Sequence, residues 1–193
     1  MTERDVHALR AQALARLAEA TRAANDAPDV ESARRYLTVA TREVLGEKEA
    51  HLRPGGLRAG ERQFVVACIF LITADRQHNL LVAEHGFPPE QHRLRIPLDF
   101  GPPGWVVQHQ RPRIIANTDE APDFRQILTT SPMGSTLSGP MFWRGAMLGQ
   151  VLTAAQARNT YGPIDLAIFM RFAHVAAAVY LAHDGPEWLR TLV

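Results

Sequence analysis

The longest uninterrupted apolar run in the chain is Phe-Val-Val-Ala-Cys-Ile-Phe-Leu-Ile, at residues 64–72. Phe, Val and Ile dominate it, and these residues favour strands. A strand without polar side chains needs cover on both faces, so we expect a central strand of a sheet. The nine residues are about half the length of a membrane-spanning helix. The rest of the chain must therefore supply neighbouring strands and covering helices.

Helical patterns flank this run. Residues 4–24 are Ala-rich with a thin apolar stripe, which needs a partner: the domain's own helices or a second copy of the chain. Pro28 interrupts the pattern, and Asp29 is placed to cap a second helix over residues 30–45. A last helix is expected over residues 164–183.

Turn residues divide the middle of the chain into short strands. Gly145, for example, marks a tight turn where a positive φ is expected. We also expect a helical turn at residues 105–110 and a short helix at 123–128. Helices that flank consecutive hairpins predict an α+β fold, an antiparallel sheet with helices packed on it. The expected strands are residues 64–73, 80–84, 94–98, 113–116, 136–142 and 146–155.

The charge balance argues against nucleic acid as a partner. The chain has 21 Lys and Arg residues against 20 Asp and Glu residues, a net charge of +1. Nucleic-acid binding proteins usually carry a basic surface. The N-terminus lacks the basic start and apolar stretch of a secretory signal. We therefore expect a cytoplasmic protein that contacts neither nucleic acid nor a membrane.

The single cysteine, Cys68, limits the chemistry further. It cannot form an intramolecular disulfide, a thiolate metal cluster or a thiol relay with a resolving partner. Its place in the apolar run is typical of a small buried hydrophobic residue. No Ser-His-Asp order, phosphate-binding loop or paired-carboxylate arrangement offers another catalytic site.

Five segments between residues 95 and 181 form a recognisable series. In this order they resemble the sequence pattern of the GAF domain family. The resemblance implies a sheet of about six strands, with the first and last helices on one face and a ligand pocket on the other. The segments are Ile96 to Gly101 with Gly104 to Val107, Gln110 to Asn117, Ala121 to Phe124, Ser135 to Met141 followed by Arg144 to Leu152, and Tyr161 to Asp165.

The same resemblance sets the domain boundaries. Residues 29–185 are expected to form the GAF domain, and residues 1–28 an N-terminal helical arm. Residues 186–193 would then be a C-terminal tail. The chain is too short for a GAF domain and an output domain, so any signal is expected to leave through a protein partner.

In GAF domains the turn at residues 100–105 and the loop after the next strand usually border the ligand cavity. The turn would aim helix N-terminal amides at an anion or polar atom, or its glycines and prolines only shape the chain. Trp105 is a cavity wall or part of the core, and Asn117 offers both donors and acceptors. The implied ligand-binding residues are Phe70, Phe100, Gly101, Gly104, Trp105, Ile115, Ala116, Asn117, Phe124 and Ser135.

Other ligands of the family find less support. His109 and His92 are the candidate axial ligands for haem or another tetrapyrrole, although most lone histidines are solvated or hydrogen-bonded. The residue set of cyclic-nucleotide-binding members is not recognisable. Cys68 lies in the first strand, away from the usual bilin attachment position. The free-methionine-sulfoxide reductases of the family rely on several cysteines, which this chain lacks.

The sequence therefore predicts a non-catalytic small-molecule sensor. It would signal through a partner such as a histidine kinase or a regulator. A homodimer is expected through the first helix and residues 173–181, unless these helices pack within one molecule. The alternatives are a haem or tetrapyrrole sensor of gas or redox state, and a redox enzyme related to the sulfoxide reductases. The ligand and any cofactor stay unknown from sequence.

Overall fold

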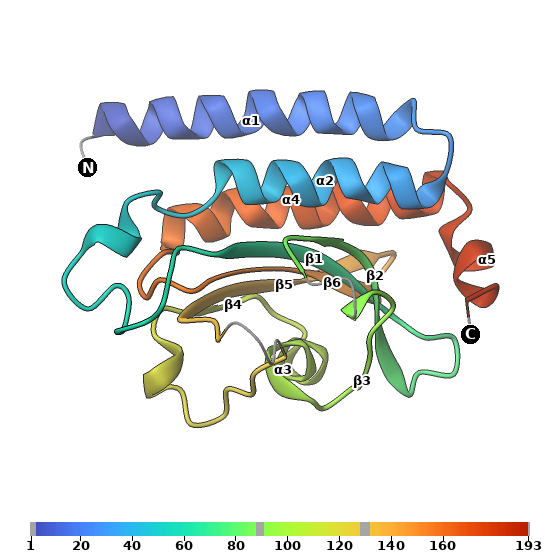
Figure 1. The fold of residues 1–193 in the computed structure, drawn as a ribbon. Coiled ribbons are helices and arrows are strands. Elements are labelled where there is room, and N and C mark those ends of the chain that lie inside the picture. The colour runs from blue at the N-terminus through green and yellow to red at the C-terminus, as the bar shows by residue number, and fades with distance from the viewer. Residues whose placement is uncertain (1–2, 88–90, 128–131, 193) are drawn as a thin grey trace.

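The apolar run forms β1 (Val65–Ile72) in the middle of an antiparallel sheet (Figure 1). The computed structural model of the chain describes residues 3–87, 91–127 and 132–192. Within these residues the sheet has six strands, in the order β3-β2-β1-β6-β5-β4. The other strands are β2 (His78–His85), β3 (Arg95–Pro97), β4 (Arg113–Ile115), β5 (Ser135–Trp143) and β6 (Ala146–Ala155).

The expected α+β class and the antiparallel sheet are confirmed. The turn between β5 and β6 has positive φ angles at Arg144 (48°) and Gly145 (80°), as the sequence predicted for the glycine. Gly149 in β6 has a different role. A Cβ atom there would lie 2.2 Å from the carbonyl oxygen of Phe70, so the glycine allows β1 and β6 to pack closely.

Three helices cover one face of the sheet in two layers: α1 (Glu3–Asn25), α2 (Val30–Val44) and α4 (Pro163–Ala182). Helices α2 and α4 lie against the sheet, and α1 lies outside them (Figure 1). The Asp29 side chain caps α2 by accepting a 2.7 Å hydrogen bond from the Ser32 N–H, as expected. The Asp165 carboxylate accepts the N–H groups of Gly46 and Gly162, which joins the end of α2 to the start of α4.

The thin apolar stripe of α1 has its partner within the molecule. Ala13, Leu17, Ala20 and Ala24 are buried in the same hydrophobic cluster as α2 and α4. Small residues of α4, including Ala176 and Ala177, are buried there too. The inner faces of both helices are therefore used in packing the domain. The boundary expected after residue 28 falls at the α1–α2 connection and stays a prediction.

Helix α4 is long and apolar enough to cross a membrane by length and composition alone. In the structure its apolar side chains pack on the sheet, so it forms the core of the helical face. Gly139 in β5 makes this contact close. A Cβ atom there would lie 2.8 Å from the Phe169 ring and 2.7 Å from the Met170 sulfur. The glycine thus lets α4 rest directly on β5.

The opposite face carries α3 (Gly101–His109) and irregular segments (Figure 1). The short helix expected at residues 123–128 is absent from the described part, residues 123–127, and Leu128 lies outside the described residues. A 3-10 helix, η3 (Thr118–Glu120), forms a few residues earlier instead. The expected C-terminal tail contains a further helix, α5 (Gly185–Arg190), and η1 (Ala50–Leu52) follows α2.

Candidate functional site

A small cavity lies on the α3 face of the sheet, under residues 122–127, which we call the strap. Its volume is about 20 Å³, enough for about one water molecule. The sheet supplies an apolar floor, and Thr136 of β5 adds a hydroxyl group. The lining residues are Val66, Phe87, Pro102, Phe124, Arg125, Gln126, Ile127, Met133, Thr136, Leu152 and Ala154.

Unpartnered polar atoms gather on this face of the sheet. Leu137 and Gly139 of β5 face the helices, so Thr136 and Ser138 face α3. Their hydroxyl groups are buried, with residue exposures of 2% and 1%, and neither has a hydrogen-bond partner in the structure. Nearly all buried polar groups in native proteins have a partner, so these two require an explanation.

Two amide side chains under α3 add to this group. The Gln150 Nε2 atom donates to the Pro103 carbonyl at 3.1 Å and to the Asn79 Oδ1 atom at 3.2 Å. The Gln150 Oε1 and Asn79 Nδ2 atoms are buried without a partner. Both residues are 0% exposed. Of these four residues, Thr136 lines the cavity, and Ser138, Gln150 and Asn79 lie outside its described lining.

The turn before α3 is shaped by its glycines. Gly101 has a φ of +61°, and a Cβ atom on Gly104 would lie 2.2 Å from the Asp99 carbonyl carbon. Pro102 and Pro103 fall in the first turn of the helix and have no N–H group. The Gly104 N–H donates to the Phe100 carbonyl. The amides expected to hold an anion here are thus mostly missing, and the structural role of the turn is favoured.

Trp105 lies away from the cavity, outside its lining. The ring of His109 stacks on the Trp105 ring at 4.1 Å between centroids, with an angle of 15° between the planes. The guanidinium groups of Arg113 and Arg111 lie 4.8 and 5.2 Å from the Trp105 ring centroid. Trp105 therefore forms a cluster with cations and a histidine, rather than a wall for a ligand.

The two histidines considered for haem do not line the cavity either. The His109 Nδ1 atom lies 2.8 Å from the Trp105 carbonyl oxygen, at the end of its own helix. The His92 Nδ1 atom lies 2.5 Å from the Glu84 carboxylate, and half of the His92 side chain is exposed. Each ring thus has a local hydrogen-bond partner. Within the described residues, no group of three or more His, Cys, Asp or Glu residues is placed to hold a metal ion.

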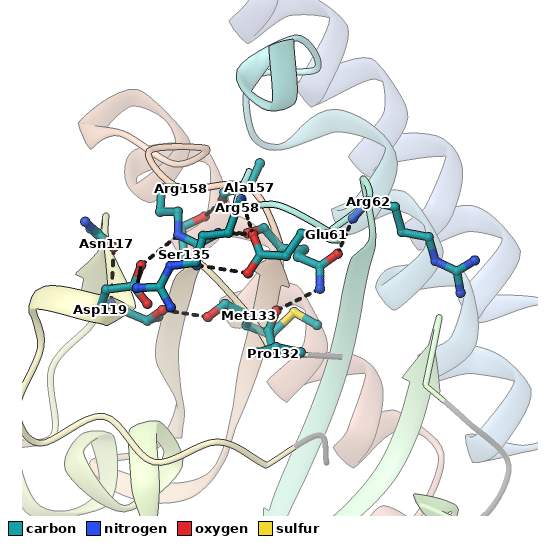
Figure 2. A network of polar contacts seen from close by, with 12 residues as sticks. Arg58, Glu61, Arg62, Asn117, Asp119, Pro132, Met133, Ser135, Ala157 and Arg158 are labelled. Carbon is teal, nitrogen blue, oxygen red and sulfur yellow. Dashed lines mark hydrogen bonds and ion pairs between the residues drawn. The ribbon is translucent and has the colours of Figure 1, made fainter. Parts of the chain in front are cut away.

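A polar network holds the segments that border the cavity (Figure 2). The Arg158 side chain is 5% exposed and forms ion pairs with Glu61 and Asp119. Asp119 also pairs with Arg58 at 2.7 Å. The hydrogen bonds between Glu61 and Arg158 lower the pKa of the Glu61 carboxyl group and raise the pKa of the Arg158 guanidinium group. The loop at residues 58–61, η3 and the end of β6 are joined in this way.

Asn117 and Ser135 belong to this network rather than to the cavity (Figure 2). The Asn117 Oδ1 atom accepts the Asp119 N–H and caps η3, while its Nδ2 atom donates to Glu120 at 2.7 Å. The Ser135 hydroxyl group donates to the Ala157 carbonyl at 2.7 Å. Because these groups are engaged internally, both residues position the segments around the cavity.

The strap is joined to β4 by a two-bond ion pair. The Arg113 Nη1 and Nη2 atoms donate to the Asp123 carboxylate at 2.6 and 2.8 Å. This pair lowers the pKa of Asp123. Asp123 therefore anchors the strap to β4. On the other side of the strap, the Gln91 Nε2 atom donates to the Ile127 carbonyl at 3.4 Å.

A larger cleft of about 700 Å³ lies on the helical side, between α1, the end of α2 and the start of α4. Its polar groups have partners: Asp165 accepts two backbone N–H groups, and the Lys48 ammonium group donates to the Leu45 carbonyl. None of its lining residues carries a buried unpartnered side-chain atom. We therefore take the small cavity, which has such an atom, as the candidate site.

The sequence of the chain matches the model of a known domain family. The model of the family described as GAF domain matches residues 56–179, which is more than half of the chain. The chain belongs to the GAF domain family. No curated protein matches it in sequence. The GAF domain is a ligand-binding regulatory fold, so a cavity for a ligand is consistent with the family.

Solved structures share the fold of this GAF domain at low sequence identity. The GAF domain of a phosphoenolpyruvate-protein phosphotransferase from Coxiella burnetii is 21% identical, with a TM-score of 0.70 over 91% of this chain and 96% of that chain. The corresponding Acinetobacter domain is 15% identical (TM-score 0.69; 94% and 95% covered). Free methionine-R-sulfoxide reductase from Neisseria meningitidis, with its substrate, is 16% identical (TM-score 0.70; 95% and 93% covered).

The structure brings only part of the predicted ligand set to the cavity of the GAF domain. Phe124 lines it, and Phe70 is fully buried in the same hydrophobic cluster as its floor. Ile115 is buried at the end of β4, whereas Ala116 is exposed and Phe100 is 37% exposed. Thr136, which also lines the cavity, was not among the predicted residues. A polar residue inside an otherwise apolar strand segment was the available signal for it.

Proposed function

We propose that this GAF domain is a non-catalytic sensor that binds a small molecule between the sheet and the strap. The supporting observation is the buried Thr136 hydroxyl group, which lines the cavity and has no hydrogen-bond partner in the structure. An unpartnered buried polar group costs about 1–3 kcal/mol. A ligand that satisfies this hydroxyl group would recover part of this cost on binding, and this recovery favours the bound state.

Binding of a metabolite requires the cavity to widen. At about 20 Å³ it is too small for a metabolite, so the strap has to move outwards. The strap is held mainly by side-chain contacts, the Arg113–Asp123 pair and the Gln91 contact to Ile127. A ligand would shift the population towards an open strap. We propose that a partner protein, such as a histidine kinase or a regulator, reads this change.

Cys68 supports a role without catalysis. It is fully buried, and burial raises the pKa of its thiol well above the usual value. The thiolate is the reactive form of cysteine, so the protonated thiol is a poor nucleophile. Redox chemistry of the kind that needs an accessible thiolate is therefore disfavoured at this residue.

A pair of threonine variants tests the proposed site. We expect Thr136→Val to raise the free energy of unfolding by about 1 kcal/mol, because it replaces a buried hydroxyl group that has no partner with a methyl group of similar size. Thr153→Val is the matched control. Its hydroxyl group contacts the Val66 carbonyl and the Tyr161 hydroxyl group, and we expect a loss of about 1 kcal/mol. Urea unfolding measures both values.

Binding is then read with the same variants. Small fragments are screened by changes in the backbone amide NMR signals of β5 in the full chain. We expect fragments to shift these signals in the wild type and in Thr153→Val, and to bind Thr136→Val at least about tenfold more weakly. Equal binding by Thr136→Val would place the ligand elsewhere, and no binding by the wild type would overturn the sensor proposal.

A further inference from the structure

We propose that the contact between Arg42 of α2 and His85 at the end of β2 is a proton-sensitive latch, which joins the helical layer to the strand segments that lead into the candidate cavity. The Arg42 Nη1 atom lies 3.0 Å from the His85 Nε2 atom. The latch responds to pH and needs no ligand, so this inference goes beyond the proposed function. Three features of the structure support it.

The first feature is the direction of the hydrogen bond. A guanidinium group has only donors, so the His85 Nε2 atom must accept the bond from Arg42. An imidazole ring can accept at this atom only when it is neutral, with its proton on Nδ1. Protonation of His85 would place two N–H groups, and two positive charges, against each other. The contact with Arg42 therefore exists in only one protonation state of the ring.

The second feature is the set of charges around the His85 ring. Within the described residues, the charged groups that act on it all belong to α2, and they are Arg42, Arg35 and Glu43. Two of the three are cations, and the contact with Arg42 is partly buried. Burial, and next the positive charge of Arg42, lower the pKa of His85 from its ordinary value of 6.5.

The acids beside the ring have partners of their own. The Glu43 carboxylate pairs with Arg16 of α1 at 2.7 Å. Glu84, which precedes His85 in β2, pairs with His92 at 2.5 Å. Because successive side chains of a strand point to opposite faces of the sheet, Glu84 and His85 lie on different faces. A protonated His85 ring would thus find no free carboxylate in its described surroundings.

The third feature is the place of the latch in the chain. The Arg42 Nε atom also donates to the Val65 carbonyl at 2.9 Å, so one side chain of α2 holds both β1 and β2. Val66 directly follows Val65, and Phe87 follows His85 by two residues. Both Val66 and Phe87 line the candidate cavity. Opening of the latch would free the segments that supply these two lining residues, so a proton is a second input to the domain.

Imidazole NMR signals of the full chain test the latch. The His85→Gln variant identifies the His85 signal by its loss. We expect this signal to titrate in the wild type with a midpoint below pH 6.5, and the backbone amide signals of Val66 and Phe87 to shift with the same midpoint. In His85→Gln the side-chain oxygen can accept from Arg42 at every pH, so these amides should lose that midpoint. A wild-type His85 midpoint at or above pH 6.5 would overturn the proposal, as would amides that do not follow it.

Arg42→Gln is the reciprocal variant. It removes the cation and keeps an amide group that can donate to the His85 ring. We expect the titration midpoint of His85 to rise towards the ordinary value of 6.5, because one cause of its lowering is gone. An unchanged midpoint would show that Arg42 does not control the protonation of His85, and the latch would be rejected.

The pH dependence of stability gives an independent test. Because the pKa of His85 is lowered in the folded state, its contribution to stability is complete above about pH 6.5 and is lost as the pH falls through the folded value. We expect urea unfolding to show a smaller loss of stability between pH 7 and pH 5 in His85→Gln than in the wild type. His174→Gln, at an exposed position of α4, is the control and should follow the wild type. Equal losses in His85→Gln and the wild type would contradict the latch.

Discussion

At the scale of single residues, Arg158 forms ion pairs with two carboxylates although its side chain is only 5% exposed. It joins Glu61 and Asp119, which lie far apart in the sequence, at the end of β6 (Figure 2). Removing one partner of a buried ion pair leaves an uncompensated charge and is strongly destabilising. The network thus joins the loop at residues 58–61 and η3 to the end of β6.

This pairing predicts the behaviour of the domain in acid. The pKa of Glu61 is lower in the folded state than its ordinary value of 4.5. Its contribution to stability is therefore complete above about pH 4.5 and is lost as the pH falls through the lower folded value. We expect Glu61→Gln to lower the free energy of unfolding at pH 7 by about 2 kcal/mol. Urea unfolding between pH 7 and pH 3 measures this.

The dependence of the unfolding free energy on pH below pH 4.5 is the more specific test of this pair. We expect the stability of Glu61→Gln to fall less steeply below pH 4.5 than that of the wild type, because the titrating carboxylate is gone. Glu19→Gln, at a glutamate whose side chain is 63% exposed, is the control and should follow the wild-type curve. An identical acid limb in Glu61→Gln and the wild type would contradict the role given to this pair.

At the scale of elements, α5 covers a buried cation. The Arg34 side chain of α2 is 0% exposed, and its guanidinium group lies 3.9 Å from the ring centroid of Trp188 in α5. Arg93 lies 5.0 Å from the same ring and pairs with Glu31. Burial lowers the pKa of Arg34 to about 10, so it is charged at neutral pH. The cation–π contact offsets part of the cost of burying it.

Two tryptophans test the attachment of α5. We expect Trp188→Ala to lower the free energy of unfolding by about 2 kcal/mol, because it removes the cation–π contact and exposes Arg34. Trp143→Ala is the control, since Trp143 is 43% exposed beside the β5–β6 turn and should cost about 0.5 kcal/mol or less. Thermal unfolding of both variants measures the difference, and equal losses would rule out a special role for Trp188.

The strands and the long helices could be predicted from the sequence, whereas the shortest helices could not. The apolar run of β1, the Asp29 cap of α2 and the Gly145 turn each reflect local patterns, and each was confirmed. Helix α5 and η3 are too short to be stable alone, so their formation depends on tertiary contacts such as the one between Trp188 and Arg34. No sequence pattern encodes those contacts.

Part of the cavity lining followed from the family resemblance, because Phe124, which it implied, lines the cavity. Asn117 caps η3 and lies outside the lining, and a sequence does not reveal whether a side chain caps a local turn or faces a cavity. Thr136 was not predicted, because its lack of a partner depends on what the fold places around it.

At the scale of the whole molecule, the outer face of α1 is the surface left for a second copy. The inner stripe of the helix is buried within the molecule, whereas Leu14 is 48% exposed beside a shallow groove lined by Arg10 and Ile168. The homodimer expected from the sequence stays a prediction. If it forms through α1, it must use this outer face.

Light scattering tests the dimer. We expect the wild type to have the mass of a dimer at micromolar concentration and Leu14→Glu to have that of a monomer, because a charge would be buried at the contact. Leu52→Glu is the control, at a residue that is 70% exposed in η1, and it should leave the mass unchanged. A monomeric wild type would exclude the dimer.

The absence of a side chain at Gly139 has a consequence for how a signal would cross the domain. Thr136 and Ser138 lie on one side of β5, and the Phe169 ring of α4 touches the other side at Gly139. At Gly139 the backbone of β5 thus separates the candidate pocket from the helical layer with no side chain between them. A ligand that displaces this part of β5 would move α4 directly, without a change in the loops at the edge of the sheet.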